Sequence, residues 1–234
     1  ILGILIMACQ TPDEGALKGF YMPKKAKKGG IIHQFESKGL QSGREYWYYN
    51  LRETADSTNL IITVYDEHLN QQQLSVEKEL SNGWVQQQLL LFFPDSTGTQ
   101  TEQVYIHTGN RFVFDLQDSV DVLLYRIQWQ ERIDQTEATK RLFRNNRFMG
   151  FDTLQLLGAD SRAAHFRSRD KIEDDRQGTL TLDLVSDEYY VKDWGLVAKK
   201  QFYMDNGKEV LLREMKLTDT LRMNDLEQLL KDKY

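Results

Sequence analysis

The sequence predicts a mainly β protein, an antiparallel meander that forms a half-barrel or open barrel and ends in a C-terminal helix. Short runs of alternating apolar and polar residues recur from residue 31 onward, separated by turn-forming residues. Asn82-Gly83 lies between two such runs, and this pair favours a hairpin because both central residues of a type I′ turn need a positive φ. With 234 residues, of which 40% are hydrophobic, the chain can bury a core in one domain.

Residues 44–52 show the strongest strand pattern, because they are rich in aromatic residues that alternate between two faces. Trp47, Tyr49 and Leu51 share one face of this strand. Residues 101–107 and 111–116 are expected to form a hairpin across Thr108-Gly109-Asn110. The other expected strands are residues 31–36, 59–67, 71–80, 84–93, 121–133, 148–157, 163–171, 178–185, 198–204 and 208–217.

Two segments depart from the alternation. Residues 134–147 predict a short polar helix or a long loop. Residues 218–234 predict a terminal helix with its leucines near one face and Asn224 or Asp225 as its cap. We expect this helix to pack across a sheet, and the alternative is a helix that binds a partner. The leucines are Leu221, Leu226, Leu229 and Leu230.

The N-terminal residues 1–8 carry an apolar run that ends in the small residue Ala8, directly before Cys9. A helix needs ~20 apolar residues to span a bilayer, so this run is too short. Its length suits the apolar core of a secretory signal, which ends in a small-residue cleavage site. The alternative is an N-terminal strand with an inert cysteine.

Ile6-Met7-Ala8-Cys9 resembles the lipobox of bacterial lipoproteins. The resemblance implies cleavage before Cys9, a diacylglycerol on its thiol and an acyl chain such as palmitate on its new amino group. Two or more acyl chains anchor a protein stably, whereas one binds only marginally. Gln10, where retained lipoproteins carry Asp, implies the outer membrane. An ordinary signal peptide remains the alternative.

These inferences divide the chain into four expected parts. Residues 1–8 are a signal-peptide remnant, 9–30 a lipid anchor and flexible tether, 31–217 the β domain and 218–234 the terminal helix. The lysine-rich run Lys24-Lys25-Ala26-Lys27-Lys28 falls in the tether. We favour a solvated linker there over contact with anionic lipid headgroups, which is the alternative.

The closing segment, residues 189–217, carries Tyr-Tyr-Val-Lys-Asp-Trp-Gly-Leu-Val and then the turn Asp205-Asn206-Gly207. It resembles the final hairpin of exported β-proteins of the lipoprotein-carrier type. The resemblance implies the half-barrel fold of those carriers. It carries no transport residue over to this chain, because the carriers' other motifs have no match here.

Composition and spacing give no catalytic or metal site, and we expect neither an enzyme nor a cofactor. The net charge of −5 does not favour nucleic acid as a partner. One cysteine allows no intramolecular disulfide and no cysteine-rich zinc site. None of the four histidines has the spacing of metal ligands, and no serine or carboxylate lies in a catalytic motif.

The aromatic side chains of Tyr46, Trp47, Tyr48 and Tyr49 are the remaining candidate ligand-binding residues. On a concave face their rings would hold an apolar or carbohydrate ligand. We favour the alternative that they belong to the core.

Three classes of function fit the sequence. We favour a non-catalytic, outer-membrane-anchored module that binds an envelope protein or a glycan through a rigid β scaffold. The second is a carrier of a lipid or lipoprotein, which needs a continuous apolar cavity. The third, an anchored hydrolase, has no motif in its favour.

Overall fold

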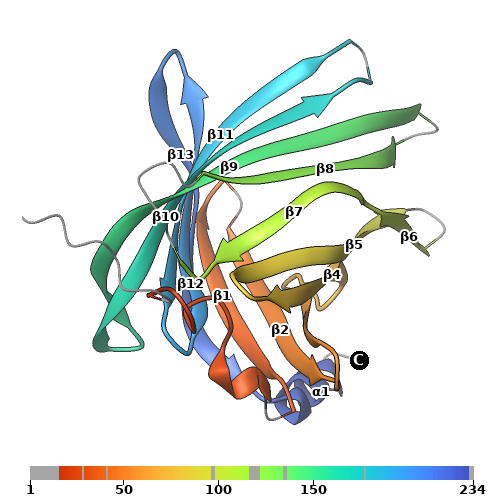
Figure 1. Ribbon diagram of the computed structural model, residues 1–234. Helices are drawn as coiled ribbons and strands as arrows, with labels where there is room; N and C mark the ends of the chain where they lie inside the picture. The colour runs from red at the N-terminus through yellow and green to blue at the C-terminus, as the bar shows by residue number, and fades with distance from the viewer. Residues whose placement is uncertain are drawn as a thin grey trace, which may run out of the picture.

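Antiparallel strands dominate the protein in a computed structural model (Figure 1). It describes residues 16–27, 29–40, 42–95, 98–115, 122–133, 136–176 and 178–231. The elements are η1 (Lys24–Lys27), β1 (Ile31–Gly39), β2 (Gly43–Glu53), β3 (Thr58–Tyr65), β4 (Gln71–Leu80), β5 (Gly83–Asp95), β6 (Gly98–Gln103), β7 (Tyr105–Val113), β8 (Val122–Ile133), β9 (Thr136–Leu156), β10 (Ala159–Asp174), β11 (Leu180–Val191), β12 (Gly195–Asp205), β13 (Lys208–Leu221) and α1 (Met223–Lys231).

The sheet closes on itself as a barrel. Its thirteen strands follow the order β4-β3-β2-β1-β13-β12-β11-β10-β9-β8-β7-β5-β6, and β4 also pairs with β5. All strands except β6 therefore belong to a closed ring. The prediction of a mainly β antiparallel fold is confirmed. The predicted half-barrel or open barrel is wrong, because the hairpin of β4 and β5 around Asn82-Gly83 joins both ends of the sheet.

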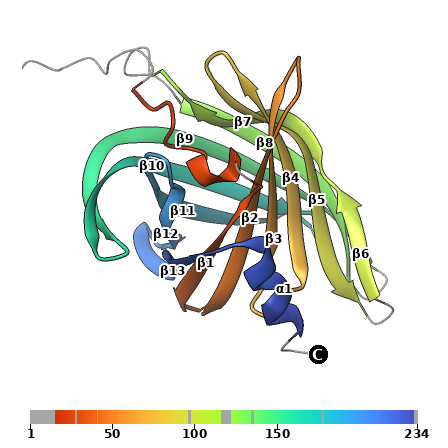
Figure 2. The ribbon, with the colours of Figure 1, turned by 90° about the horizontal axis from the view of Figure 1, so that it is seen from below.

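An N-terminal segment, residues 16–27, closes one end of the barrel, and we call it the plug. Seen from below, η1 lies inside the ring of strands, at the end that we call the plug end (Figure 2). Leu17, Phe20, Tyr21 and Ala26 of the plug are buried. The chain predicted as a flexible tether is therefore part of the folded core from residue 16 onward.

The plug packs into the main apolar core. The ring of Tyr21 lies 5.0 Å from Phe112, 5.9 Å from Tyr190 and 6.1 Å from Trp84, measured between centroids. Its hydroxyl donates to Glu77 at 2.7 Å. These contacts join the plug to strands on several sides of the barrel.

Helix α1 covers the outer face of the sheet (Figure 2). Its buried Leu226 packs with Ile32 and Tyr46. The prediction of a helix across a sheet is confirmed, but β13 extends to Leu221, so the helix begins only at Met223. Within the part of the chain that is described, no helix is long and apolar enough to cross a membrane.

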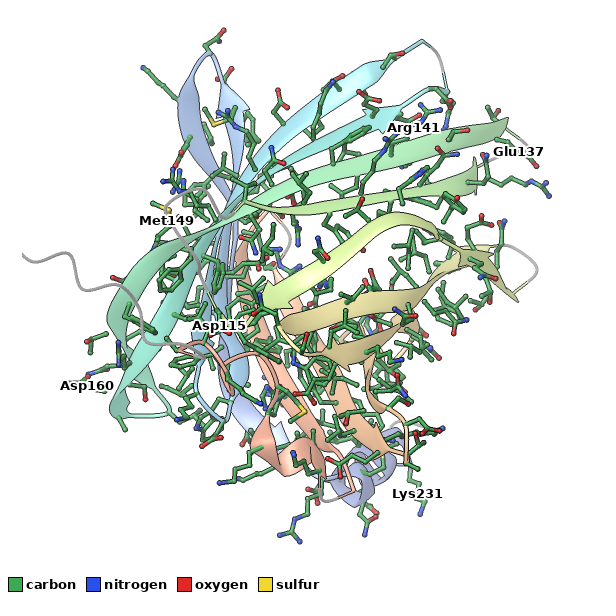
Figure 3. The ribbon with its side chains drawn as sticks, in the orientation of Figure 1. Asp115, Glu137, Arg141, Met149, Asp160 and Lys231 are labelled. Carbon is green, nitrogen blue, oxygen red and sulfur yellow. The ribbon has the colours of Figure 1, made fainter. Side chains whose placement is uncertain are left out.

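Two local predictions are wrong. Residues 136–147 belong to β9, because its polar side chains form ion pairs with neighbouring strands, as Arg144 does with Asp170 at 2.6 Å. The expected hairpin across Thr108-Gly109-Asn110 is absent, because β7 runs straight through these residues. Glu137 and Asp160, close to the two ends of β9, lie on opposite sides of the molecule (Figure 3).

Candidate functional site

Two hollows meet at the plug end of the barrel, and both are lined by Lys25 and Ile31. The smaller, of about 260 Å³, we call the apolar pocket; the larger, of about 640 Å³, we call the cationic hollow. Besides the two shared residues, Pro23, Lys24, His33, Asp193 and Trp194 line the apolar pocket. The cationic hollow is completed by Gly29, Gly30, Thr220, Leu221, Arg222, Met223 and Asn224.

Helix η1 fixes the lysines at the rim of these hollows. Ala26 is buried, whereas Lys24, Lys25 and Lys27 are exposed on the same short turn. The backbone N–H of Lys24 donates to the carbonyl of Asp193 at 2.9 Å, which ties η1 to the turn between β11 and β12. A small residue among lysines thus places their charges on a rigid support.

The apolar pocket is built around the indole of Trp194. Lys25 Nζ lies 5.6 Å from the centroid of this ring, a distance typical of a cation–π contact. Pro23 and Ile31 add aliphatic surface to the pocket. A volume of about 260 Å³ accommodates a group somewhat larger than benzene, for which a cavity of ~150 Å³ is sufficient.

His33 forms part of the wall of the apolar pocket and is fully buried. Neither of its ring nitrogens has a hydrogen-bond partner among the described residues. Burial, helped by the charge of Lys25, lowers the pKa of His33 to about 3. The imidazole is therefore neutral at pH 7 and contributes no charge to the pocket.

The cationic hollow lies between the side chains of Lys25 and Arg222. Lys27 forms a salt bridge with Glu53 at 3.4 Å. Within the described part of the chain, Lys24, Lys25 and Arg222 form no salt bridge. Their charges are therefore available to an anion, and the adjoining pocket is available to an apolar group.

Charged side chains inside the barrel form a second cluster, which we call the interior belt. Its members pair across strands: Arg111 with Glu77, Arg144 with Asp170, Lys199 with Glu188 and Arg213 with Glu45. The four cations balance the four carboxylates. The belt therefore places matched charges inside the barrel beside the apolar core.

The four candidate aromatic residues of β2 divide between two packed faces. Trp47 and Tyr49 join the core inside the barrel. Tyr46 and Tyr48 join the cluster under α1 on the outside. Neither pair lines the apolar pocket or the cationic hollow. Cys9, the predicted lipidation site, lies outside the described residues.

The residues of the plug-end site could be recognised in the sequence, but the sequence did not predict that they lie close together. The lysine run and Trp194 were both visible, yet more than 160 residues separate them, and only the closed barrel joins them. Within the described ranges, no group of histidine, cysteine or acidic side chains could hold a metal ion.

The opposite end of the barrel, which we call the far end, carries two unpaired strand edges. The last residue pair of β7 and β8 there is Tyr105 with Gln128. Beyond it, β6 pairs only with β5 among the described strands, and the end of β8 pairs only with β9. Glu102 of β6 accepts a hydrogen bond from the backbone N–H of Gln130 at 3.3 Å. One carboxylate therefore occupies an edge donor of β8.

The register of β5 and β6 identifies the groups at the free edge. Pro94, which has no N–H, pairs with Thr99, as expected at a position without ladder hydrogen bonds. The same alternation turns the N–H and C=O groups of Thr99, Thr101 and Gln103 toward the free edge. This edge lacks the lysine or proline that commonly blocks strand pairing.

The sequence matches no protein-family model and no curated protein. The fold is similar to that of two crystal structures. One, from Bacteroides fragilis, is described as an exported protein with a YmcC-like fold; the TM-score is 0.57 at 12% identity, over 87% of this chain and 100% of that chain. The other, from Parabacteroides distasonis, is described as a lipoprotein; the TM-score is 0.55 at 12% identity, over 87% of this chain and 99% of that chain. The chain shares the fold of these two proteins.

Proposed function

We propose that the protein is an exported, lipid-anchored docking module of the bacterial outer membrane, which binds an extended segment of another envelope protein. The observation that carries the proposal is the free edge of β6 at the far end. Extended peptides commonly bind by adding a strand to such an edge. Main-chain hydrogen bonds then provide affinity and side-chain contacts provide specificity.

The anchoring half of the proposal rests on the lipobox-like Ile6-Met7-Ala8-Cys9. Both structures with a similar fold are described as exported or as lipoproteins, which supports the same location. Acylation of Cys9 would hold the barrel at the membrane through the N-terminal part of the chain, next to the plug end. The far end would then be presented to other envelope components.

The interior belt favours docking over the carriage of a lipid or lipoprotein. A carrier needs a continuous apolar cavity, whereas the interior of this barrel holds the ion pairs of the belt and the buried side chains of the plug. Glycan binding by the aromatic residues of β2 is also disfavoured, because their rings pack inside the barrel and under α1.

The anchor is tested by fractionating cells that produce the Cys9→Ser variant. We expect the variant to leave the membrane fraction after a high-salt wash, because salt screens headgroup contacts but does not release acyl chains. Quantitative retention of the variant would contradict lipidation at Cys9.

The docking edge is tested by a photo-crosslinking amino acid at Gln103 in intact cells. We expect one defined adduct, and we expect Thr101→Pro to abolish it because proline removes an edge N–H. Thr101→Val is the matched control, because it keeps the N–H and the shape of the side chain. A probe at Arg126, on a strand paired on both sides, controls for random collision.

An adduct that persists in Thr101→Pro would show that the partner does not use the main chain of this edge. An adduct with polysaccharide rather than protein would support the glycan alternative. Either result would overturn the docking proposal while leaving the anchor untouched.

A further inference from the structure

We propose that the plug end is a binding site for an anionic phospholipid of the anchoring membrane. The headgroup phosphate would lie in the cationic hollow between Lys25 and Arg222, and an apolar part of the lipid would enter the pocket beside Trp194. The inference rests on the proposed function, because it assumes a protein held at a membrane. According to this inference, the plug end of the barrel faces that membrane.

Charge is the first argument. Lys24, Lys25 and Arg222 are exposed and form no salt bridge with a described residue. Asp193 lines the apolar pocket, and Glu53 is already paired with Lys27. Among the described residues that line the cationic hollow, two are cations and none is a carboxylate, although the nearby Asp225 accepts the backbone N–H of Arg222. An anion there is attracted from two sides.

Polarity is the second argument. The cationic hollow and the apolar pocket share Lys25 and Ile31, so a polar and an apolar hollow open side by side. An amphipathic molecule has the same division, whereas a free phosphate ion would use the cationic hollow alone. Tryptophan and lysine also suit a membrane interface, because each combines apolar surface with a polar group.

Chain length is the third argument. Six residues lie between Cys9 and Ala16, where the described chain begins, so seven Cα–Cα steps join the two. Fully extended, these seven steps span at most ~25 Å. The plug follows at once, and Leu17 donates its N–H to the carbonyl of Phe114 at 3.1 Å within the fold. An acyl anchor on Cys9 therefore holds the N-terminal part of the plug close to the membrane surface.

Rigidity distinguishes this site from an ordinary basic tail. The three lysines of η1 are held by the burial of Ala26 and by the hydrogen bond between Lys24 and Asp193. Arg222 is held at the start of α1, where its N–H donates to Asp225 at 2.7 Å. The backbone that carries these groups is therefore already ordered, and only side-chain freedom is lost when they meet a headgroup.

The test uses the full chain carrying Cys9→Ser, which cannot be acylated, and vesicles of two compositions. One is pure phosphatidylcholine and the other is three parts phosphatidylcholine to one part phosphatidylglycerol. We expect tighter binding to the second. Each cation near the surface contributes about fivefold, so Lys24→Gln/Lys25→Gln/Arg222→Gln should weaken that binding on the order of a hundredfold.

The matched control removes three exposed lysines elsewhere, Lys38→Gln/Lys171→Gln/Lys208→Gln, and changes the net charge equally. We expect it to bind at least tenfold more tightly than the plug-end variant. Equal losses in both variants would mean that only net charge matters, and the site would be wrong. Circular dichroism confirms that both variants are folded.

The apolar part of the site is tested with phosphatidylglycerol brominated in its acyl chains, which quenches nearby tryptophans. We expect quenching to fall sharply in Trp194→Phe and to persist in Trp129→Phe, which changes a tryptophan of the other apolar cluster. Unchanged quenching in Trp194→Phe would overturn the seating of the lipid.

Competition separates the lipid from a free anion. We expect inorganic phosphate to displace the protein from vesicles no better than chloride at equal ionic strength. Specific displacement by phosphate would assign the cationic hollow to a soluble anion and overturn the lipid assignment. All of these assays use unacylated protein, so their failure would leave the anchor at Cys9 unaffected.

Discussion

Gly195 holds the turn between β11 and β12 against the plug. Its φ is +73°, and a Cβ there would lie 2.7 Å from the carbonyl oxygen of Tyr21. A side chain would therefore push the plug away from the barrel and strain the backbone. Lys24 and Asp193, which pair through their backbones beside this turn, would move with it.

We expect Gly195→Val to lower the free energy of unfolding more than Gly207→Val does, by roughly 1–3 kcal/mol. Gly207 is the matched control because its φ is +79°, yet a Cβ there would meet nothing within 4 Å. Both variants lose the same conformational freedom, so their difference reports the contact with the plug. Urea unfolding of the three proteins measures it, and equal losses would contradict this role of Gly195.

His33 makes stability depend on pH. Its folded pKa is lowered to about 3 from 6.5 by burial and by Lys25, so the unfolded chain binds a proton that the folded protein does not. The contribution of His33 to the free energy of unfolding is therefore fully present above pH 6.5. It falls as the pH drops toward 3, by up to roughly 1.4 kcal/mol per pH unit. We expect His33→Phe to flatten this dependence between pH 6 and 4.5.

Urea unfolding across that range measures the slope, and His68→Phe is the control because His68 is exposed. If wild type and His33→Phe lose stability in parallel, folding does not lower the pKa of His33, and a neutral imidazole in the folded protein at pH 4.5 is excluded.

At the scale of the element, α1 depends on one leucine. Leu226 is buried against Ile32 and Tyr46, whereas Leu229 is 40% exposed. Leu226→Ala should therefore lower the free energy of unfolding by about 2–4 kcal/mol, and Leu229→Ala by less than about 1 kcal/mol. Thermal melts of both variants measure this, and similar losses would mean that α1 does not dock through Leu226.

Elements with a clear alternation were predictable from the sequence, and elements stabilised by charge were not. The faces of β2 follow directly from the order of its aromatic residues, as Trp47 and Tyr49 lie inside the barrel and Tyr46 and Tyr48 outside. In contrast, β9 has a polar sequence, and its polar residues, such as Arg144, form ion pairs with carboxylates on neighbouring strands. Whether such a polar segment forms a strand depends on ion-pair partners that are distant in sequence. The pattern of the segment alone does not show those partners.

The plug-end site was unpredictable for a related reason. Its lysines look like a solvated tether in sequence, since the burial of Ala26 depends on a barrel that closes around it. Closure itself was missed because alternation shows that strands pair, but does not show whether the last strand returns to the first.

At the scale of the whole molecule, the barrel separates two ends with different properties. The plug end carries unpaired cations and an apolar pocket, and the far end carries unpaired strand edges. Between them lie the ion pairs of the interior belt and the apolar core into which the plug packs. The proposed docking module would use this separation, because binding at the far end would leave the proposed membrane contact undisturbed.

The interior belt sets the stability of that scaffold at low pH. Burial alone would raise the pKa of Glu188, but the charges of Lys199 and Arg144 outweigh burial and hold it well below its usual range. Lys199 Nζ lies 2.9 Å from the carboxylate, and Tyr190 donates its hydroxyl to the same group at 2.8 Å. Because the folded pKa is lowered, this contribution is present above the unfolded value near 4.5 and is lost as the pH falls below it.

We expect Glu188→Gln to lower the free energy of unfolding at pH 7 by about 2–4 kcal/mol, because two half-buried cations lose a buried carboxylate partner. The deficit relative to wild type should shrink as the pH falls below 4.5, because the unfolded wild-type chain then takes up a proton at Glu188 that the folded protein does not. Glu137→Gln is the control, since Glu137 forms only an exposed pair with Arg132, and we expect it to change little at any pH. A deficit that stays constant down to pH 2 would mean that Glu188 is not held as a charged partner, and that shape rather than charge keeps the barrel closed.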